Sequence, residues 1–170
     1  MKPFLLAMSF LTFFGLKSAQ ALPIGATAPA LDAIDQDGQK LNLGDFYRKG
    51  LVLVYFYPKA DTPGCTAQAC SLRDAYADLL TDGVHVVGVS HDSPVAQKKF
   101  QEKYRLPFTL IADQDGRVAK AFEVPTMLGF TKRQAFLIRD GKVVWADFSA
   151  STQKQAEDVR KAIRDLGAKS

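Results

Sequence analysis

Two cysteines lie five positions apart in this 170-residue chain, Cys65 and Cys70, inside the segment ADTPGCTAQAC. An apolar, β-favouring run, LVLVYFY at 51–57, precedes them, followed by a short loop with two prolines and a glycine. Sulfur reacts as the thiolate, and unpaired backbone N–H groups at a helix start favour the thiolate over the thiol. If a helix begins near Cys65, its sulfur is placed to be reactive.

The spacing of the two cysteines limits when they can bond. Residues five apart on a regular helix have Cα atoms roughly 8.7 Å apart. A disulfide tolerates at most about 7 Å. If both cysteines share one helix, Cys65 and Cys70 can bond only after the first turn or two unwinds, which suits a bond that forms and breaks during turnover. A permanent structural disulfide is the simpler alternative in an oxidising compartment.

The elements around the cysteines alternate between strand and helix patterns. Continuous apolar runs at 51–57, 84–90 and 108–112 are typical of strands buried on both faces. Helical patterns at 66–80 and 94–104 separate these runs. The alternation predicts an α/β sheet with parallel crossovers, and Cys65 follows the carboxyl end of a strand, where ligands of such sheets gather.

Two Asp-Gly pairs, at 37–38 and 140–141, each separate strand-like segments and so predict two hairpins. The last segment, STQKQAEDVRKAIRDLG, is typical of a closing helix capped by Ser151 or Thr152 and stopped by Gly167. We therefore expect an α/β fold, a mixed β-sheet flanked by helices with an N-terminal β-hairpin extension. This order of elements suits the thioredoxin-like fold.

The first 21 residues, MKPFLLAMSFLTFFGLKSAQA, have the pattern of a secretory signal peptide. An apolar run ends at Lys17, and an A-x-A site predicts cleavage after Ala21, leaving 22–170 as a single domain. A membrane anchor is the alternative, but a span needs about 18 apolar residues and this run is shorter. We expect an exported protein, periplasmic or else secreted, without stable membrane association after cleavage.

The charge gives no reason to expect nucleic acid as a partner. The formal net charge is only +4, and two of the lysines lie in the leader. The remaining basic residues are interleaved with acids, as in KKFQEKYR and EDVRKAIRD, which is typical of solvated helix faces.

The segment YFYPKADTPGCTAQACSLRD closely resembles the active-site segment of peroxiredoxins, in the peroxiredoxin Q or bacterioferritin comigratory protein subgroup. The family pattern P-x-x-x-T-x-x-C is matched by Pro58, Thr62 and Cys65, and the subgroup's C-x-x-x-x-C spacing is matched by Cys70. In TKRQAFLIRDGKVV, Arg133 falls at the family's active-site arginine. The resemblance covers nearly the whole chain after the leader.

The resemblance implies thiol-dependent reduction of hydrogen peroxide and organic hydroperoxides. The Cys65 thiolate would attack the peroxide and become a sulfenic acid, and Cys70 would resolve it as a transient intrachain disulfide. A thioredoxin-like or glutaredoxin-type donor would then restore both thiols. No metal, flavin or nicotinamide cofactor is required, and the protein is expected to be a monomer.

The other matched residues have physical roles beside the sulfur. The Thr62 hydroxyl can orient the peroxide, although threonine is also a common helix cap. The Arg133 charge favours the thiolate and stabilises the leaving oxygen, although a lone arginine is more often a solvated surface charge. Pro58 would shield the sulfur and preset the loop.

Two rival functions use the same cysteines. A Cu(I)-binding thioredoxin-like protein would use two cysteines and a histidine, but His85 and His91 lack the spacing of metal ligands. An exported thiol-disulfide reductase would normally expose C-x-x-C, whereas four residues intervene here.

Overall fold

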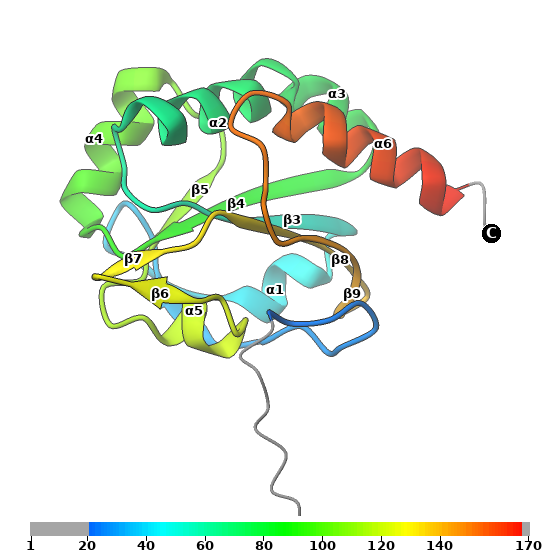
Figure 1. The fold of residues 1–170 in the computed structure, drawn as a ribbon, viewed down its shortest axis with the longest axis horizontal. Coiled ribbons are helices and arrows are strands. Elements are labelled where there is room, and N and C mark those ends of the chain that lie inside the picture. The colour runs from blue at the N-terminus through cyan, green and yellow to red at the C-terminus, as the bar shows by residue number, and fades with distance from the viewer. Residues whose placement is uncertain (1–20, 168–170) are drawn as a thin grey trace, which may run out of the picture.

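A five-stranded mixed sheet, in the order β5-β4-β3-β8-β9, forms the centre of the fold (Figure 1). The computed structural model describes residues 21–167, so the predicted leader falls outside the described part except for Ala21. The strands are β3 (Leu51–Phe56), β4 (Val84–Ser90), β5 (Thr109–Ala112), β8 (Gln134–Arg139) and β9 (Lys142–Asp147). Strands β3, β4 and β5 are parallel, and β8 runs antiparallel to both β3 and β9. The expected mixed sheet is confirmed.

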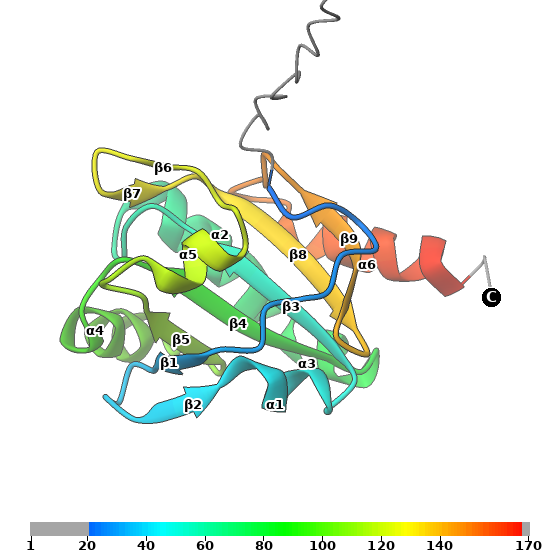
Figure 2. The ribbon, with the colours of Figure 1, turned by 90° about the horizontal axis from the view of Figure 1, so that it is seen from below.

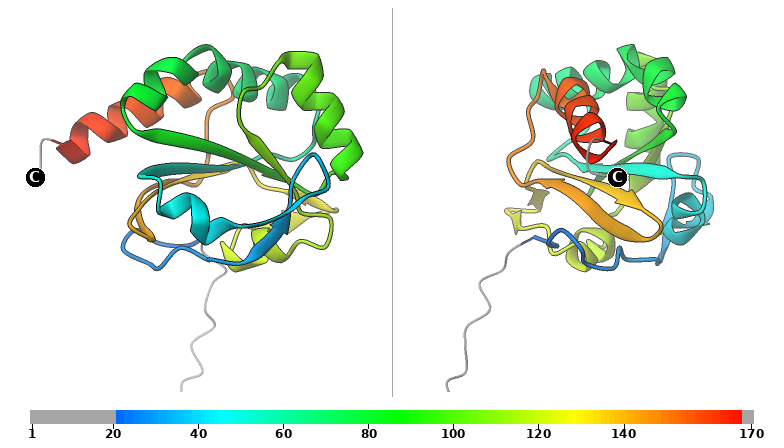
Figure 3. Two further views of the ribbon diagram at one scale, coloured as in Figure 1. Left: turned by 180° about the vertical axis from the view of Figure 1, so that it is seen from behind. Right: turned by 90° about the vertical axis from the view of Figure 1, so that its right-hand side faces the viewer.

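Helices cover both faces of this sheet, which gives three layers (Figures 1 and 3). One face carries α2 (Pro63–Asp74), α3 (Tyr76–Thr81), α4 (Pro94–Tyr104) and α6 (Gln155–Gly167). The shorter helices α1 (Leu43–Tyr47) and α5 (Arg117–Ala121) lie on the other face (Figure 2). Within residues 21–167, no helix combines the length and the apolar character that a membrane span needs.

Strand β3 shows why its sequence is apolar throughout. All six of its residues are buried. Leu53 and Tyr55 pack into the core beneath α2 and α4, while Val54 and Phe56 pack into the core on the opposite face. Because alternate side chains of a strand point to opposite faces, a strand with helices on both sides needs apolar residues at every position.

The helix predicted over 66–80 is wrong in its bounds, because it begins earlier and is broken. Helix α2 starts at Pro63, whose fixed φ suits the first turn, and ends at Asp74. Ala75 leaves the helical conformation, with φ −96° and ψ 4°. The ring of Tyr76 then packs against Phe108, with centroids 5.7 Å apart. The break therefore directs α3 along the sheet toward β4.

Both Asp-Gly hairpins are confirmed. At the β8–β9 turn, Asp140 and Gly141 have φ values of 51° and 70°, as a tight two-residue turn requires. The first hairpin pairs β1 (Asp32–Ile34) with β2 (Lys40–Asn42). A third hairpin, β6 (Thr126–Met127) with β7 (Phe130–Thr131), was not predicted; neither were α1 and α5. These short elements carry too little periodicity to stand out in a sequence.

The closing helix begins at Gln155, two or three residues later than expected. The Ser151 hydroxyl accepts hydrogen bonds from the N–H groups of Gln153 and Lys154. Ser151 therefore stabilises a turn ahead of the helix rather than its first turn, and the predicted cap at Ser151 or Thr152 is wrong. The segment before α6 instead runs close to the start of α2 (Figure 1).

Candidate active site

The first cysteine lies where a helix start meets the core. Cys65 is the third residue of α2, and only 1% of its surface is exposed. The backbone N–H groups of a first helical turn lack partners within the helix, and they form the positive end of its dipole. The condition that a helix begins near Cys65 is therefore met.

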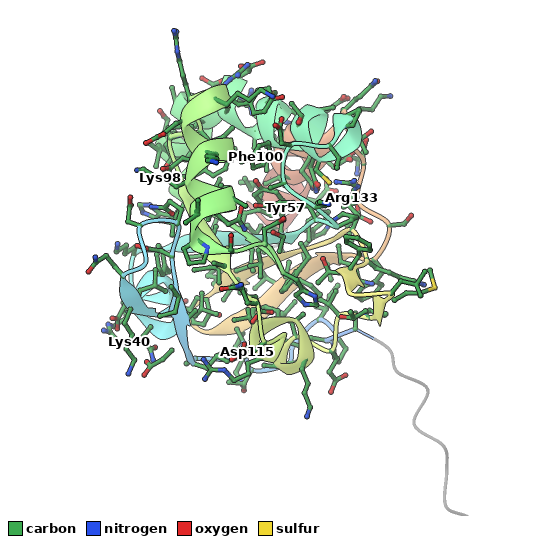
Figure 4. The ribbon with its side chains drawn as sticks, turned by 90° about the vertical axis from the view of Figure 1, so that its left-hand side faces the viewer. Lys40, Tyr57, Lys98, Phe100, Asp115 and Arg133 are labelled. Atoms are coloured by element: carbon green, nitrogen blue, oxygen red, sulfur yellow. The ribbon has the colours of Figure 1, made fainter. Side chains whose placement is uncertain are left out.

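The guanidinium of Arg133 contacts this sulfur. Its Nη2 donates to Cys65 Sγ at 3.4 Å, and its Nη1 donates to Gln68 Oε1. Strand pairing explains the encounter, because Phe56 at the end of β3 pairs with Gln134 at the start of β8. Arg133 precedes β8 and is thereby carried to the loop that follows β3. Figure 4 labels the side chains of Arg133 and of Tyr57, the first residue of that loop.

The loop between β3 and α2 is tied down at several points. The Ala60 N–H donates to Asp92 Oδ2 at 2.7 Å, and the Thr131 hydroxyl donates to the Tyr57 carbonyl at 2.9 Å. Asp61 adopts a left-handed conformation, φ 58°, and its carboxylate accepts from Lys103 Nζ and the Tyr104 hydroxyl. The hydrogen bond from Lys103 lowers the pKa of Asp61 below its ordinary value. The loop that leads to Cys65 is thus held by α4, by Asp92 after β4 and by Thr131 in β7.

The two other matched residues lie in this loop. Pro58 is half-buried, directly after Tyr57. Thr62 precedes α2 with an extended backbone, yet its hydroxyl makes no capping bond and donates instead to the Lys59 carbonyl at 3.0 Å. The cap alternative for the Thr62 side chain is therefore wrong. Its oxygen keeps lone pairs for a further hydrogen bond.

The second cysteine is on the same helix and away from the first. Cys65 and Cys70 are both free, and Cys70 is half-buried. Helix α2 is continuous from Pro63 to Asp74, so its regular geometry holds their Cα atoms roughly 8.7 Å apart. Both cysteines therefore share one helix, which was the condition in the sequence analysis. A disulfide between them requires α2 to unwind.

Two buried glutamines beside the site were missed from the sequence. Gln68 has no exposed surface, accepts from Arg133 and donates to Gln155 Oε1 at 2.8 Å. The one available signal was spacing, since Gln68 lies three positions after Cys65 and so belongs to the same part of the helix surface. Nothing local in the sequence indicated Gln155, which is 87 positions away from Gln68.

The two histidines have other surroundings. His91 Nδ1 lies 3.0 Å from the Gly129 carbonyl oxygen, and His91 Nε2 lies 3.9 Å from Asp113 Oδ2. His85 lies in β4, where it pairs with Val52. Across residues 21–167, no three His, Cys, Asp or Glu side chains are grouped so that they could hold a metal ion.

Comparison with known proteins gives one consistent family. Residues 24–146 match the AhpC/TSA family. Peroxiredoxin Bcp of Escherichia coli K12 is 46% identical over 140 residues, which cover 76% of this chain and 89% of that protein. Chloroplastic peroxiredoxin Q of Populus jackii is 40% identical over 146 residues, 84% of this chain and 68% of that protein.

The fold agrees with these sequence relatives. The crystal structure of the peroxidoxin BcpB from Mycobacterium tuberculosis superimposes with a TM-score of 0.80 and 33% identity. The superposition covers 85% of this chain and 98% of that one. The thioredoxin-like fold expected from the order of elements is confirmed.

Proposed function

Because the chain belongs to the AhpC/TSA family, as a peroxiredoxin of the peroxiredoxin Q and Bcp group, we propose that it reduces hydroperoxides by a two-cysteine cycle. Thiol-dependent peroxidase activity follows from that membership, and the chain is an oxidoreductase. The contact between Arg133 and Cys65 at the start of α2 is the observation that carries the assignment of the reacting sulfur.

In the first step, the Cys65 thiolate attacks the terminal oxygen of the hydroperoxide. The S–O bond forms as the O–O bond breaks, the leaving oxygen takes a proton to become water or an alcohol, and the sulfur is left as a sulfenic acid. Negative charge develops on the leaving oxygen, where Arg133 and the N–H groups at the start of α2 can stabilise it. The Thr62 hydroxyl orients the peroxide beside the sulfur. Pro58 shields the sulfur from solvent.

In the second step, Cys70 attacks the sulfenic sulfur, water leaves, and an intrachain disulfide forms. This step requires α2 to unwind, because its regular geometry keeps the two sulfurs too far apart. A dithiol of the thioredoxin-like or glutaredoxin type then reduces the disulfide by thiol-disulfide exchange.

We extend the proposal to the protein's location and state. The pattern of residues 1–21 supports export, cleavage after Ala21 and a periplasmic location for residues 22–170. The exported product is proposed to be a monomer. An exported peroxidase would need a reductant on the outer side of the membrane. The rival functions, a thiol-disulfide reductase and a Cu(I)-binding protein, gain no support from the relatives.

One experiment tests both chemical steps. Reduced protein, residues 22–170, is mixed with one equivalent of hydroperoxide, and peroxide loss is followed together with the masses of the cysteine peptides. We expect stoichiometric peroxide loss and a bond between Cys65 and Cys70. Cys65→Ser should abolish turnover, and Cys70→Ser should permit a single reduction and then accumulate oxidised Cys65. Normal multiple turnover by Cys65→Ser would refute the assignment.

A further inference from the structure

Helix α2 turns one side toward the N-terminal end of α6 (Figure 1). Gly64, Gln68 and Ser71 follow the spacing i, i+4 and i+7, which places them in one stripe on the helix surface. Gln68 Nε2 donates to Gln155 Oε1 at 2.8 Å, and the Ala156 N–H donates to Ser71 Oγ at 3.3 Å. Gln68 lies between the two cysteines and Ser71 directly follows Cys70, so the part of α2 that must unwind during resolution is bonded to α6 within it and at its end.

Gln155 is an unusual residue to bury. It has no exposed surface, and while its Oε1 accepts from Gln68, its Nε2 is buried without a hydrogen-bond partner. A buried donor left unpaired costs free energy that an apolar side chain of equal length would avoid. The useful group of Gln155 is thus its side-chain carbonyl oxygen, which accepts from Gln68 Nε2 and holds the Gln68 amide in place.

Fixing Gln68 also fixes the arginine of the site. The Oε1 of Gln68 accepts from Arg133 Nη1, and Arg133 Nη2 donates to Cys65 Sγ. The order Gln155, Gln68, Arg133, Cys65 is therefore one continuous chain of hydrogen bonds from α6 to the sulfur. A residue of α6 that does not contact the sulfur holds the group that does.

The hydrogen bond from the Ala156 N–H to Ser71 Oγ stabilises the start of α6. Ala156 is in the first turn of α6, whose N–H groups have no partner within the helix. Ser71 Oγ supplies one from another helix. When α2 unwinds, α6 loses this acceptor and Gln155 loses its donor. Unwinding therefore carries a cost at α6 as well as within α2.

We propose that Gln155 is a positioning residue and that the pairs Gln155–Gln68 and Ala156–Ser71 form a latch that holds α2 wound. The opening of this latch limits how fast Cys70 reaches the sulfenic acid of Cys65, and the inference rests on the proposed two-cysteine cycle. A latch that opens slowly lengthens the life of the sulfenic acid. A second hydroperoxide can then oxidise it to the sulfinic acid, with release of water or an alcohol.

Rapid mixing with hydrogen peroxide, acid quench, thiol alkylation and intact mass measurement separate the two steps. Gln155→Met removes the acceptor at nearly constant length. We expect its second step to be about fivefold faster, the change in an opening equilibrium on losing one hydrogen bond. Its first step should slow by up to about threefold, because Arg133 is less firmly held. Trapping as sulfinic acid should need correspondingly more peroxide.

Ser71→Ala tests the Ala156–Ser71 pair by removing the hydroxyl that accepts from Ala156, and Ser71→Thr keeps a hydroxyl at this position. We expect Ser71→Ala to accelerate the second step and Ser71→Thr to restore the wild-type rate. Val159→Ala is the control. It shortens a fully buried side chain of α6 and leaves a cavity there, but it removes neither hydrogen bond of the latch. It should lower the melting temperature and leave the second step unchanged.

The outcomes separate this inference from the proposed function. If wild-type protein forms no disulfide with peroxide, the two-cysteine cycle fails and the latch with it. If wild-type protein forms the disulfide, but Gln155→Met and Ser71→Ala resolve at the wild-type rate or no faster than Val159→Ala, the latch alone is overturned. Should Gln155→Met not fold, the Ser71 pair decides.

Discussion

The Nη2 of Arg133 lies 3.4 Å from the sulfur of Cys65, although the two residues are 68 positions apart in the chain. One comes from the residue before β8 and the other from the first turn of α2. A fixed positive charge at this distance can stabilise negative charge that develops on a leaving oxygen beside the sulfur. In the proposed cycle, this contact joins the reacting sulfur to the charge that stabilises the leaving oxygen.

Replacing Arg133 should therefore lower the rate of Cys65 oxidation more than it lowers the stability of the folded protein. For Arg133→Gln, we expect the second-order rate of Cys65 oxidation to fall about 100-fold, the usual scale for losing one stabilising donor. Stopped-flow measurement of peroxide consumption checks this. Arg139→Gln, at the far end of β8 from Arg133, is the matched control and should keep the wild-type rate. Equal rates for Arg133→Gln and wild type would remove Arg133 from the mechanism.

The Thr62 hydroxyl should matter for chemistry and little for stability. Thr62→Val keeps the β-branched shape and removes the oxygen, and we expect at least about a tenfold loss of peroxidase rate. Its melting temperature should change little, because the hydrogen bond that the substitution removes, from the Thr62 hydroxyl to the Lys59 carbonyl, is exposed to solvent. Thr62→Ser should keep most of the activity. A large drop in melting temperature with an unchanged rate would show a structural role instead.

Gly64→Ala should affect stability and peroxidase rate differently: the melting temperature should stay the same or rise, and the rate should fall. A Cβ at Gly64 would lie 3.3 Å from Arg133 Nη2 and 3.4 Å from Thr152 Cγ2. Alanine favours a helix over glycine by up to about 1 kcal/mol, and the flexible end of Arg133 can move aside. We expect Gly64→Ala to melt at the same temperature or higher while losing rate severalfold. Thermal unfolding and peroxide kinetics on one preparation decide it, and a full wild-type rate contradicts the prediction.

Asp113 should make stability depend on pH. It is buried at the start of α5, where its carboxylate accepts from the N–H groups of Val118 and Ala119. Burial raises the pKa of Asp113 above its ordinary value of 3.8, as does the nearby Asp115, while the N–H groups and His91 oppose the rise. The folded state thus binds this proton more tightly than the unfolded state does. Stability falls as pH rises from 3.8 to the raised pKa, and it is constant above.

Asp113→Asn removes this ionisation. We expect the difference in melting temperature, wild type minus variant, to decrease as pH rises from about 3.5 and to level off above the raised pKa of Asp113. Thermal unfolding of both proteins across this range measures it, and the other carboxylates cancel because both proteins carry them. A difference that grows with pH would show that the folded state favours the ionised Asp113.

Local sequence was enough for most of the sheet. The runs in β3 and β4 are typical of strands buried on two faces, and Asp140-Gly141 is a strong signal for a two-residue hairpin, because each depends on neighbours along the chain. The break at Ala75 was not predicted, because the packing of Tyr76 on Phe108 depends on a strand more than thirty residues later. The late start of α6 was missed because Ser151 bonds a turn rather than the helix.

Sequence by itself determined the two sulfurs, their spacing and the helix that separates them, since these depend on neighbours along the chain. Only the tertiary structure decided which groups surround Cys65. The antiparallel pairing of β3 with β8 brings Arg133 to it, and the packing of α6 on α2 brings Gln155 to Gln68. Contacts between distant segments follow from how whole elements pack, and no residue pattern within either segment encodes them.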